Sequence, residues 1–533
     1  MRPPVKTLAP LAAVAAALAI AGCGGDDTDD AGPAGIVPAE APVYVEVLVQ
    51  PEGEAADDAE AALSKVSGSD DPGGDIVALL ERQSSADGGR FNFEEDIEPW
   101  LGERVGFYPS SLAGETDATL VIETTDAEAA LESIREQEDA KGNEKEYEGH
   151  TFETDADGDA FGLVDDFLVF GPPAGFKQVV DAAEGGETLG DTDQFSDSIE
   201  DLPDDRLVTL FALPSSFLEG IPDDEIDPQG RRLLLRALGE AGDQPILGDI
   251  TASAEAITLE LSAGGGGVET AQSKLLGQVP SDSWLALAFA DIGKAVENGL
   301  SQVDDSNVGL DSATVRREIR RSTGIDLEQD VARALGDAAV FVTGTSEQSL
   351  GGALVVESKN ADASAQLLTK VQGLIESGVA GEFEVEPLAS TDGAQGFQLT
   401  EPGQGQGSAT TDPSGATTPP EVGLTQPITV LQRDDRIIAG YGGEAINQAL
   451  TAQGAEPLAD SAEFKSATEA MGELGIDAFL SFGPALELAE SAGATEAPGY
   501  EQAKPYLDAL SFLALATGSE EERGIARFTV GLD

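Results

Sequence analysis

The sequence contains one long internal repeat, and this repeat constrains the fold more than any other feature. Over the first part of the repeat the matching positions lie 234 residues apart: Phe93 with Leu327, Asp96 with Asp330, Leu101 with Leu335, Gly102 with Gly336, and 120–123 with 354–357. The offset is 242 at the front (Val37-Pro38 with Val279-Pro280) and 269 towards the end (Phe195 with Phe464). Self-similarity at steady offsets is the signature of duplicated structural units. We therefore predict two similar domains, residues 37–263 and residues 279–533.

Two segments outside the matching parts have the composition of loops. The change of offset from 234 to 269 places an insertion in the second copy, where residues 401–425 are rich in Gly, Ser, Thr, Pro and Gln. This composition cannot bury a core, so it predicts a disordered surface loop. A run of four glycines, Gly264 to Gly267, opens a linker that we place at 264–278.

The N-terminus is typical of an export signal. Residues 1–22 carry Arg2 and Lys6 before an alanine-rich apolar stretch that is too short to span a membrane as a helix, as in a secretory signal peptide. Cys23, the one cysteine of the chain, follows Ile-Ala-Gly in a pattern that resembles the bacterial lipobox. We expect a lipidated Cys23, a flexible acidic tether over residues 23–36, and anchoring on the outer face of the cytoplasmic membrane. The alternative is an ordinary signal peptide with a coincidental cysteine.

Charge and residue counts exclude several functions. The 533-residue chain carries 29 Lys and Arg against 100 Asp and Glu, a net charge of −71. Because phosphate binding needs clustered positive charge, we expect no nucleic-acid partner. One histidine, His150, and one cysteine are too few for a His/Cys metal site or a catalytic triad. We therefore expect no cofactor and no enzymatic activity.

Hydrophobic patterning predicts an α+β fold. In the first copy we expect strands near 43–49, 104–108, 118–124, 147–154, 160–164, 167–171 and 206–213, and a last pair of strands near 246–262. We expect helices near 56–66, 74–84, after Asp126, and near 173–184, 192–199 and 230–239. In the last strand Ile257, Leu259 and Leu261 face one way, and Thr258 and Glu260 face the other. Hairpin spacings dominate over regular β–α–β alternation, so each copy should be a mainly antiparallel sheet packed by helices on one face.

These features together have a familiar pattern. The lipobox, the segment VPAEAPVYVEV from Val37, the segment DIEPWLGERVGFY from Asp96 and the second diverged copy resemble a family of bacterial lipoproteins, common in high-GC lineages, that carries a domain of unknown function. The resemblance covers nearly the whole mature chain. It implies a location and a single fold, and it carries no activity, cofactor or catalytic residue.

An acidic turn is the best candidate for metal chemistry. Asp155, Asp157 and Asp159 fill the first, third and fifth places of a calcium loop, and Asp166 fills the twelfth. The position of the sharp-turn glycine holds Ala160, and the twelfth position should be Glu. A β-hairpin turn in a very acidic protein is therefore the interpretation that we favour over a calcium site.

Four arginines form the one basic cluster that the sequence singles out. Arg316, Arg317, Arg320 and Arg321 lie on one predicted helix, where i,i+4 pairs give a two-sided basic ridge. One hypothesis is docking to phosphate, a wall polymer or an acidic partner. The alternative, which the negative chain favours, is salt bridging to surrounding carboxylates.

Three classes of function stay open at this stage. The first is a non-enzymatic lipoprotein, a binding or scaffolding body whose partner is a protein, an envelope polymer or a lipid. The second is a carrier of an apolar ligand such as a lipid, held between sheet and helices. The third, an enzyme, needs two titrating groups that converge in a cleft, and the sequence offers no motif for it.

Overall fold

The structure is a computed structural model. It describes residues 32–86, 92–111, 117–137, 144–155, 157–221, 230–231, 242, 244–264, 272–305, 311–346, 348–378, 383–388, 394–400, 426–451, 457–520 and 523–533. The predicted signal peptide, Cys23, the 401–425 insertion and most of the helix predicted near 230–239 lie outside these residues. The chain divides into unit 1, Met1–Val268 with Ser519–Asp533, and unit 2, Glu269–Gly518.

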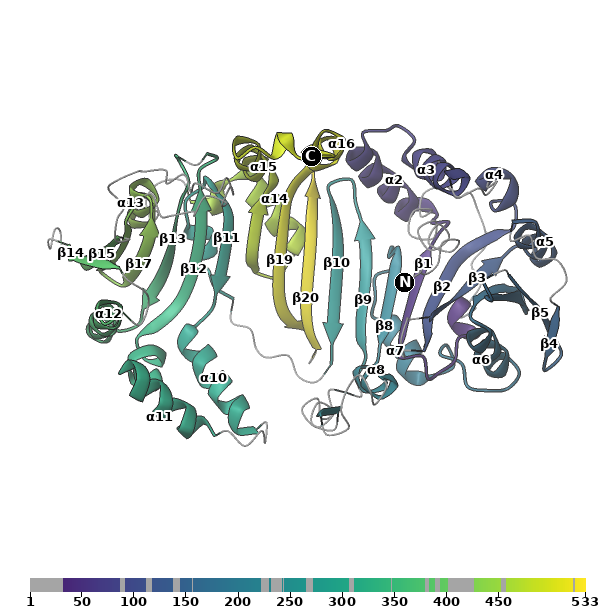
Figure 1. Cartoon of the computed structure of the whole chain (residues 1–533), viewed down its shortest axis with the longest axis horizontal. Coiled ribbons are helices and arrows are strands. Elements are labelled where there is room, and N and C mark those ends of the chain that lie inside the picture. Colours follow the sequence, from purple (N-terminus) through teal and green to yellow (C-terminus); the bar gives the residue numbers. More distant parts are fainter. Residues whose placement is uncertain are drawn as a thin grey trace, which may run out of the picture. The chain divides into compact units, whose positions relative to one another are not determined.

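Unit 1 is built on an antiparallel sheet (Figure 1). In spatial order its strands are β20 (Arg523–Leu532), β10 (Ala256–Ala263), β9 (Ile246–Ala252), β8 (Val208–Ala212), β1 (Val43–Leu48), β2 (Leu101–Ser111), β3 (Asp117–Thr124), β7 (Phe167–Gly171), β6 (Ala160–Val164), β5 (His150–Thr154) and β4 (Lys145–Tyr147). Its helices are η1 (Gly32–Gly35), α2 (Gly53–Ser67), α3 (Pro72–Ala86), α4 (Phe93–Asp96), α5 (Ala127–Gln137), α6 (Pro173–Ala183), α7 (Asp193–Ile199) and α8 (Pro214–Gly220).

Unit 2 has the same kind of sheet. Its strands are β19 (Leu510–Glu520), β18 (Ile476–Ser481), β11 (Ser283–Phe289), β12 (Leu335–Thr343), β13 (Gly351–Ser358), β17 (Arg436–Tyr441), β16 (Ile428–Arg433), β15 (Gln395–Thr400) and β14 (Glu384–Pro387). Its helices are η3 (Leu276–Gln278), α10 (Ile292–Asp305), α11 (Ser312–Thr323), η4 (Leu327–Ala332), α12 (Ala361–Glu376), α13 (Gly443–Thr451), η5 (Leu458–Asp460), α14 (Ala462–Met471), α15 (Phe482–Ser491), η6 (Ala494–Glu496) and α16 (Tyr500–Asp508). The α+β class with an antiparallel sheet is confirmed.

The two units connect their strands in the same way. The order β8-β1-β2-β3-β7-β6-β5-β4 in unit 1 corresponds to β18-β11-β12-β13-β17-β16-β15-β14 in unit 2. In both units, the first strand therefore lies between the second strand and a strand from much later in the chain. The C-terminal strand β20 pairs with β10 of unit 1, so the second compact unit ends before the predicted end of the second copy at residue 533.

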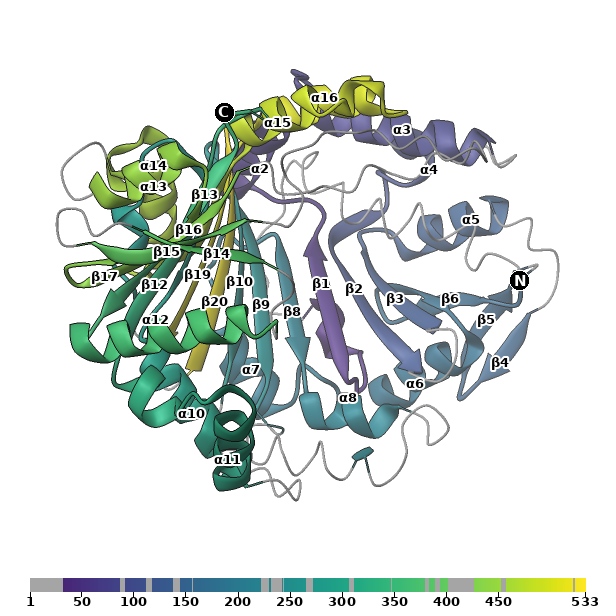
Figure 2. The same cartoon turned by 60° about the vertical axis from the view of Figure 1, so that its left-hand side comes forward.

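Helices cover the sheet of unit 1 unevenly. One apolar cluster, which includes Tyr44, Phe176 and Phe211, packs η1, α6 and α7 on one side of the sheet. A second cluster, which includes Trp100 and Phe161, packs α3, α4 and α5 on the other side, over β2, β3, β6 and β7. Figure 2 shows α5 and α6 on opposite sides of these strands. The expectation of helices on one face therefore holds only for part of the sheet.

The predicted tether extends too far into the fold. Gly32–Gly35 forms a 3-10 turn in which Pro33 and Ala34 are buried, and Ile36 belongs to the core cluster of Tyr44. The prediction of a tether up to residue 36 is wrong for residues 32–36. Five residues rich in Gly and Pro show no periodicity, so composition alone could not separate them from the acidic stretch before them.

The predicted linker has the same error at its far end. Leu275 and Leu276, inside the 264–278 segment, are buried beside η3, and the Val279 carbonyl accepts a hydrogen bond from Leu458 N at 2.8 Å. Unit 2 therefore begins before residue 279.

The strand predicted over 147–154 is two strands. Glu148 and Gly149 have φ angles of +48° and +96° and form the turn between β4 and β5. Tight hairpin turns favour positive φ at both central residues, and Gly149 accepts it without strain.

Candidate functional site

One side of the unit 1 sheet carries only apolar residues on five adjacent strands. Successive strand residues point to opposite sides, and directly paired residues on neighbouring strands point to the same side. The residues of this side, which we call the open face of unit 1, form four rows: Val43-Ala212-Ile246-Ala263-Gly524, Val45-Leu210-Gly248-Leu261-Ala526, Val47-Val208-Ile250-Leu259-Phe528, and Ala252-Ile257-Val530.

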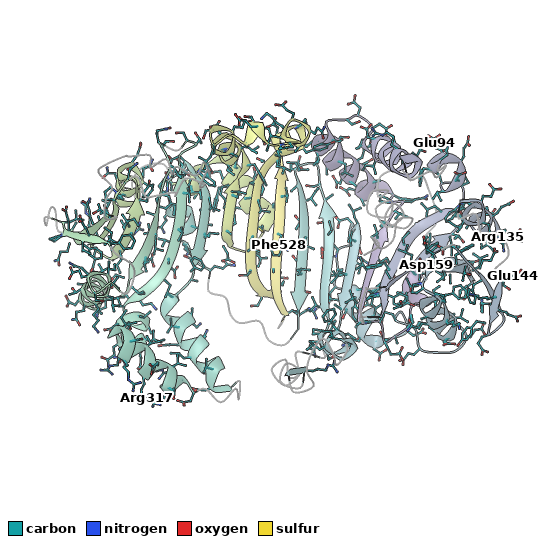
Figure 3. The ribbon with its side chains drawn as sticks, viewed as in Figure 1. Glu94, Arg135, Glu144, Asp159, Arg317 and Phe528 are labelled. Atoms are coloured by element: carbon teal, nitrogen blue, oxygen red, sulfur yellow. The ribbon has the colours of Figure 1, made fainter. Side chains whose placement is uncertain are left out.

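The open face of unit 1 is accessible to solvent. Along β8, Thr209 and Phe211 are buried, whereas the alternate residues Val208, Leu210 and Ala212 are half-buried. Phe528 on β20 is 36% exposed, and Figure 3 labels it on this strand with no helix drawn in front of it. Helix α2 packs at one end of this face, where Ala59 belongs to a cluster with Val208 and Ala252, and Val47 on β1 packs against the cluster that holds α3, α4 and α5.

Unit 2 presents an equivalent face, the open face of unit 2. Its rows are Leu513-Leu480-Leu285-Val342 and Leu515-Ala478-Leu287-Val340-Leu354-Ala439-Val430, and Phe289 lies at the end of β11. Phe289 is 53% exposed, and Leu354 and Leu513 are also exposed. Four of the six exposed large apolar residues among those described, namely Phe289, Leu354, Leu513 and Phe528, belong to the two open faces.

This arrangement departs from the usual division of an antiparallel sheet, because the helix face is also partly apolar. Such sheets place apolar residues towards their helices and polar residues towards water. Large exposed apolar patches on soluble proteins mark sites for partners, membranes or apolar ligands. Because 24% of all residues in this chain are charged, rows without one polar side chain stand out as a candidate binding surface.

The opposite side of the unit 1 sheet, its helix face, holds a row of polar and charged side chains. The row Glu46-Thr209-Asp249-Glu260-Arg527 crosses five strands in register. The Tyr44 hydroxyl donates to Glu46 Oε2 at 2.7 Å, and Arg527 Nε donates to Glu260 Oε2 at 2.7 Å. These pairings satisfy the charges at two points along the row.

Burial changes the protonation of this row. It raises the pKa of the Glu46 carboxyl, against the opposing effects of the Tyr44 hydroxyl and Arg104. Burial and the Glu260 charge raise the pKa of Asp249 to about 6, although Arg527 opposes them. The carboxylates lie along a row across the sheet and do not converge on one point, so the arrangement resembles a buried polar network more than an acid–base pair.

A shallow hollow of about 350 Å³ lies elsewhere on unit 1. Its lining includes Pro42, Tyr108, Gln178 and the carboxylates Glu40 and Asp181. The Tyr108 hydroxyl donates to the Gly175 carbonyl at 3.0 Å, so it is already used within the fold. The hollow is polar and open, and it lies apart from the residues of the open face.

The calcium candidates do not assemble a site. Asp155 Oδ1 accepts hydrogen bonds from the backbone N–H groups of Asp157, Gly158 and Asp159 at 2.7–2.9 Å, which closes the turn on itself. Asp166 lies in the β6–β7 turn. Among the described residues, no group of three or more His, Cys, Asp or Glu side chains is placed to hold a metal ion.

The arginine ridge lies on α11, as its sequence predicts. Asp311 caps the helix by accepting from Thr314 N, and Gly324 ends it with a φ of +72°. Arg320 pairs with Asp326 at 3.2 Å, Arg321 pairs with Glu318 at 2.7 Å, and Arg317 donates to the Thr314 hydroxyl. Salt bridges are therefore present, yet the side chains of Arg320 and Arg321 stay 68% and 74% exposed.

The remaining residues singled out by the sequence have structural surroundings. His150 Nε2 lies 2.9 Å from Glu184 Oε1. Trp100 is buried, and its Nε1 donates to the Asp96 carbonyl. Trp284 is half-buried, and its Nε1 donates to the Gly344 carbonyl at 2.9 Å. No helix among the described residues is both long enough and apolar enough to span a membrane.

Comparisons with known proteins identify a family. The sequence matches the family described as "Protein of unknown function (DUF3352)" over residues 6–533. The chain belongs to this family. No characterised protein matches the sequence. Among solved structures, crystal form I of TP0453 is 11% identical with a TM-score of 0.25, covering 46% of this chain and 82% of that one. Crystal form IV of TP0453 is 10% identical with a TM-score of 0.18, covering 79% and 95%.

The alternating apolar residues of the open faces are visible in the sequence, but their exposure is not. Val43, Val45 and Val47 would be assigned to a core by pattern alone. On the other side of the same strand, Tyr44 is fully buried. Glu46 shares the side of Tyr44, and Val47 on the other side packs against the cluster that holds α3, α4 and α5, so the pattern of this strand alone does not mark the open side.

Proposed function

We propose that the chain is a non-enzymatic binding protein of the cell envelope that holds the apolar chains of a lipid against its open faces. The observation that carries this proposal is the set of rows without polar side chains on β1, β8, β9, β10 and β20, repeated on the equivalent strands of unit 2. This favours the apolar-ligand carrier over a general scaffold.

An acyl chain suits these faces better than a protein does. Protein interfaces carry hydrogen bonds at roughly one per 100–200 Å², and the side chains of the open faces supply none. A second copy of the chain would bring one net charge of −71 against another, which opposes self-association. An acyl chain needs no hydrogen bonds and no charge.

The energy available is sufficient for binding. Each methylene group moved from water onto an apolar surface contributes about 0.8 kcal/mol, so a dozen contribute about 10 kcal/mol. The cost of association removes much of this sum, and micromolar affinity corresponds to about 8 kcal/mol. With the smallest cost, about 4 kcal/mol, about 6 kcal/mol remains, so a single chain lying across two or three rows would bind with a dissociation constant on the order of tens of micromolar.

Two further parts of the proposal rest on the sequence. We propose that Cys23 is lipidated and anchors the protein outside the cytoplasmic membrane, on the basis of the lipobox pattern. We also propose that the two units arose by duplication, which the equal strand connectivity supports. The two open faces would then be two versions of one ancestral lipid site.

Mass spectrometry tests the proposal. The full chain is purified from its own membranes, and its intact mass is taken under native and denaturing conditions. We expect a covalent lipid adduct on Cys23 and a second, non-covalent lipid that is lost on denaturation. An adduct alone would leave the anchor standing and contradict the lipid-carrying function.

A matched pair of variants locates the site. Ile250→Asp puts a charge on the open face of unit 1, and Thr251→Asp puts the same charge one residue further along β9, on the opposite side. The first variant should lose the non-covalent lipid of unit 1, and the second should keep it. Equal retention by both would rule out the open face of unit 1.

A further inference from the structure

The helix pair at one end of the open face of unit 2 differs in charge from its counterpart in unit 1. In both units the first and second strands are joined by a helical connection: α2, α3 and α4 in unit 1, and α10, α11 and η4 in unit 2. Helices α2 and α3 together carry two basic and six acidic residues, whereas α10 and α11 carry five basic and four acidic residues. Helix α11 is therefore a positively charged segment in an acidic chain.

This connection adjoins the open face. Strand β11 ends at Phe289, the most exposed of its apolar residues, and α10 begins three residues later at Ile292. Helix α10 packs against α11, η4 and β12, so the connection is one packed group at this end of the two strands. The arginines of α11 therefore belong to the group that borders the Phe289 end of the apolar rows.

The arginines keep donors available for a ligand. A guanidinium has five N–H donors. In the described polar contacts, Arg317, Arg320 and Arg321 each contact one side chain. Spacing at i,i+4 places Arg317 beside Arg321 and Arg316 beside Arg320 on the helix. Two neighbouring guanidinium groups form the arrangement that recognises phosphate by charge-assisted hydrogen bonds. Figure 3 shows Arg317 at the outer side of α11.

We propose that unit 2 binds an anionic amphiphile whose phosphate headgroup lies on the arginine ridge of α11 and whose acyl chain lies on the open face. This inference rests on the lipid-binding function proposed above and adds the chemical class of the ligand. The headgroup supplies the negative charge that the ridge complements, and the tail supplies the apolar surface that Leu287, Phe289 and Val340 complement. Unit 1 has no such ridge in α2 and α3, so its face should show no preference for anionic headgroups.

Calorimetric titration with matched single-chain probes tests the assignment. Hexadecyl phosphate and hexadecylphosphocholine have the same tail and differ in headgroup charge, and both are used below their micelle concentrations with the full chain. We expect one class of site to bind hexadecyl phosphate about tenfold more tightly than hexadecylphosphocholine, with a preference that weakens as salt is added. Inorganic phosphate at the same concentration should give no comparable binding, because it has no tail.

Arginine variants show where the headgroup binds. Arg316→Gln/Arg320→Gln and Arg317→Gln/Arg321→Gln should each weaken hexadecyl phosphate at the unit 2 site about tenfold and leave hexadecylphosphocholine unchanged. The control is Lys65→Gln/Arg82→Gln, which removes the two basic residues of α2 and α3. The arginines are exposed, whereas Lys65 is half-buried and donates to the Leu532 carbonyl at 3.4 Å, so a thermal melt is needed to confirm that each variant is folded.

The possible failures are distinct. If both amphiphiles bind equally and the arginine variants change nothing, the headgroup assignment is wrong and the lipid-binding function stands. If inorganic phosphate binds as tightly as hexadecyl phosphate, the ridge is a plain anion site and the inference is overturned. If neither amphiphile binds, the proposed function itself fails, and the inference fails with it.

Discussion

The substitution Phe528→Ser distinguishes a ligand-binding face from an ordinary core. Phe528 is already 36% exposed on the open face, and its partner in the row, Leu259, is half-buried. Complete burial of a Phe side chain is worth about 3 kcal/mol. A ligand that covers the exposed third gains about 1 kcal/mol from this residue, so its removal should weaken binding about fivefold.

The comparison variant is Phe211→Ser on the same sheet. Phe211 is 1% exposed on the helix face, where its ring packs edge-on against Phe195. Loss of a fully buried Phe costs about 3–5 kcal/mol of folding free energy. Phe528→Ser should cost clearly less, because part of its surface already meets water.

The assay follows both quantities in one preparation. Urea unfolding gives the free energy of unfolding, and titration with Nile red, a neutral apolar fluorophore, gives the affinity of the open face. The reasoning predicts a modest stability loss and weaker Nile red binding for Phe528→Ser. It is refuted if Phe528→Ser destabilises the fold as much as Phe211→Ser, or if its Nile red affinity equals that of the unsubstituted chain.

Three further predictions concern the fold. Because the folded pKa of Asp249 is about 6 and its unfolded value is about 4, its ionisation removes stability as pH rises from about 4 to above 6. Asp249→Asn should therefore gain about 1–2 kcal/mol over the unsubstituted chain at pH 7 and nothing at pH 4, as measured by urea unfolding at both pH values; the figure is reduced for solvent screening. Gly344 has a φ of +87°, and a Cβ there would lie 2.2 Å from the Ser349 carbonyl oxygen, so Gly344→Ala should cost about 2 kcal/mol or more, whereas Gly443→Ala, in open space, should be close to neutral. Ile36→Ala should lower the unfolding free energy by about 2–4 kcal/mol, because Ile36 is buried; a flexible tether at this position would give no change in the urea midpoint.

The positions of strands and helices could be predicted because local sequence patterns determine them. Alternation placed β1 within one residue, and the capping pattern after Asp126 placed the start of α5 at Ala127. The side assignment of Ile257, Leu259 and Leu261 against Thr258 and Glu260 also matches the pairing with β9 and β20. These features depend on residues close together in the chain, so one sequence contains the information.

The domain boundaries and the covering of a sheet face by helices could not be predicted, because both depend on residues that are far apart in the sequence. Ile36 is buried by contacts with the core cluster that reaches residue 247, and no local signal marks it as part of a domain. Likewise, Val45 shows that a face is apolar but not whether a helix will cover it. The place of β20 beside β10 depends on a pairing across more than 260 residues, which a single sequence without partners cannot indicate.

Among the candidate sites, the sequence identified residues more readily than roles. The four arginines were found by their spacing, and α11 places them on one helix as expected. The acidic turn was found by its spacing too, but the Asp155 carboxylate accepts hydrogen bonds from the backbone of its own loop. Short-range hydrogen bonds of this kind compete with metal binding and are visible only in the folded turn.

Photo-labelling with an acyl chain that carries a diazirine tests the central claim most directly. The full chain is incubated with the labelled fatty acid, irradiated and digested, and the modified peptides are mapped by mass spectrometry. The account predicts adducts on the open faces, at residues such as Leu210, Leu259 and Phe528 in unit 1 and Leu287 and Leu354 in unit 2. Adducts confined to the surfaces of the helices, or no specific adducts at all, would contradict it.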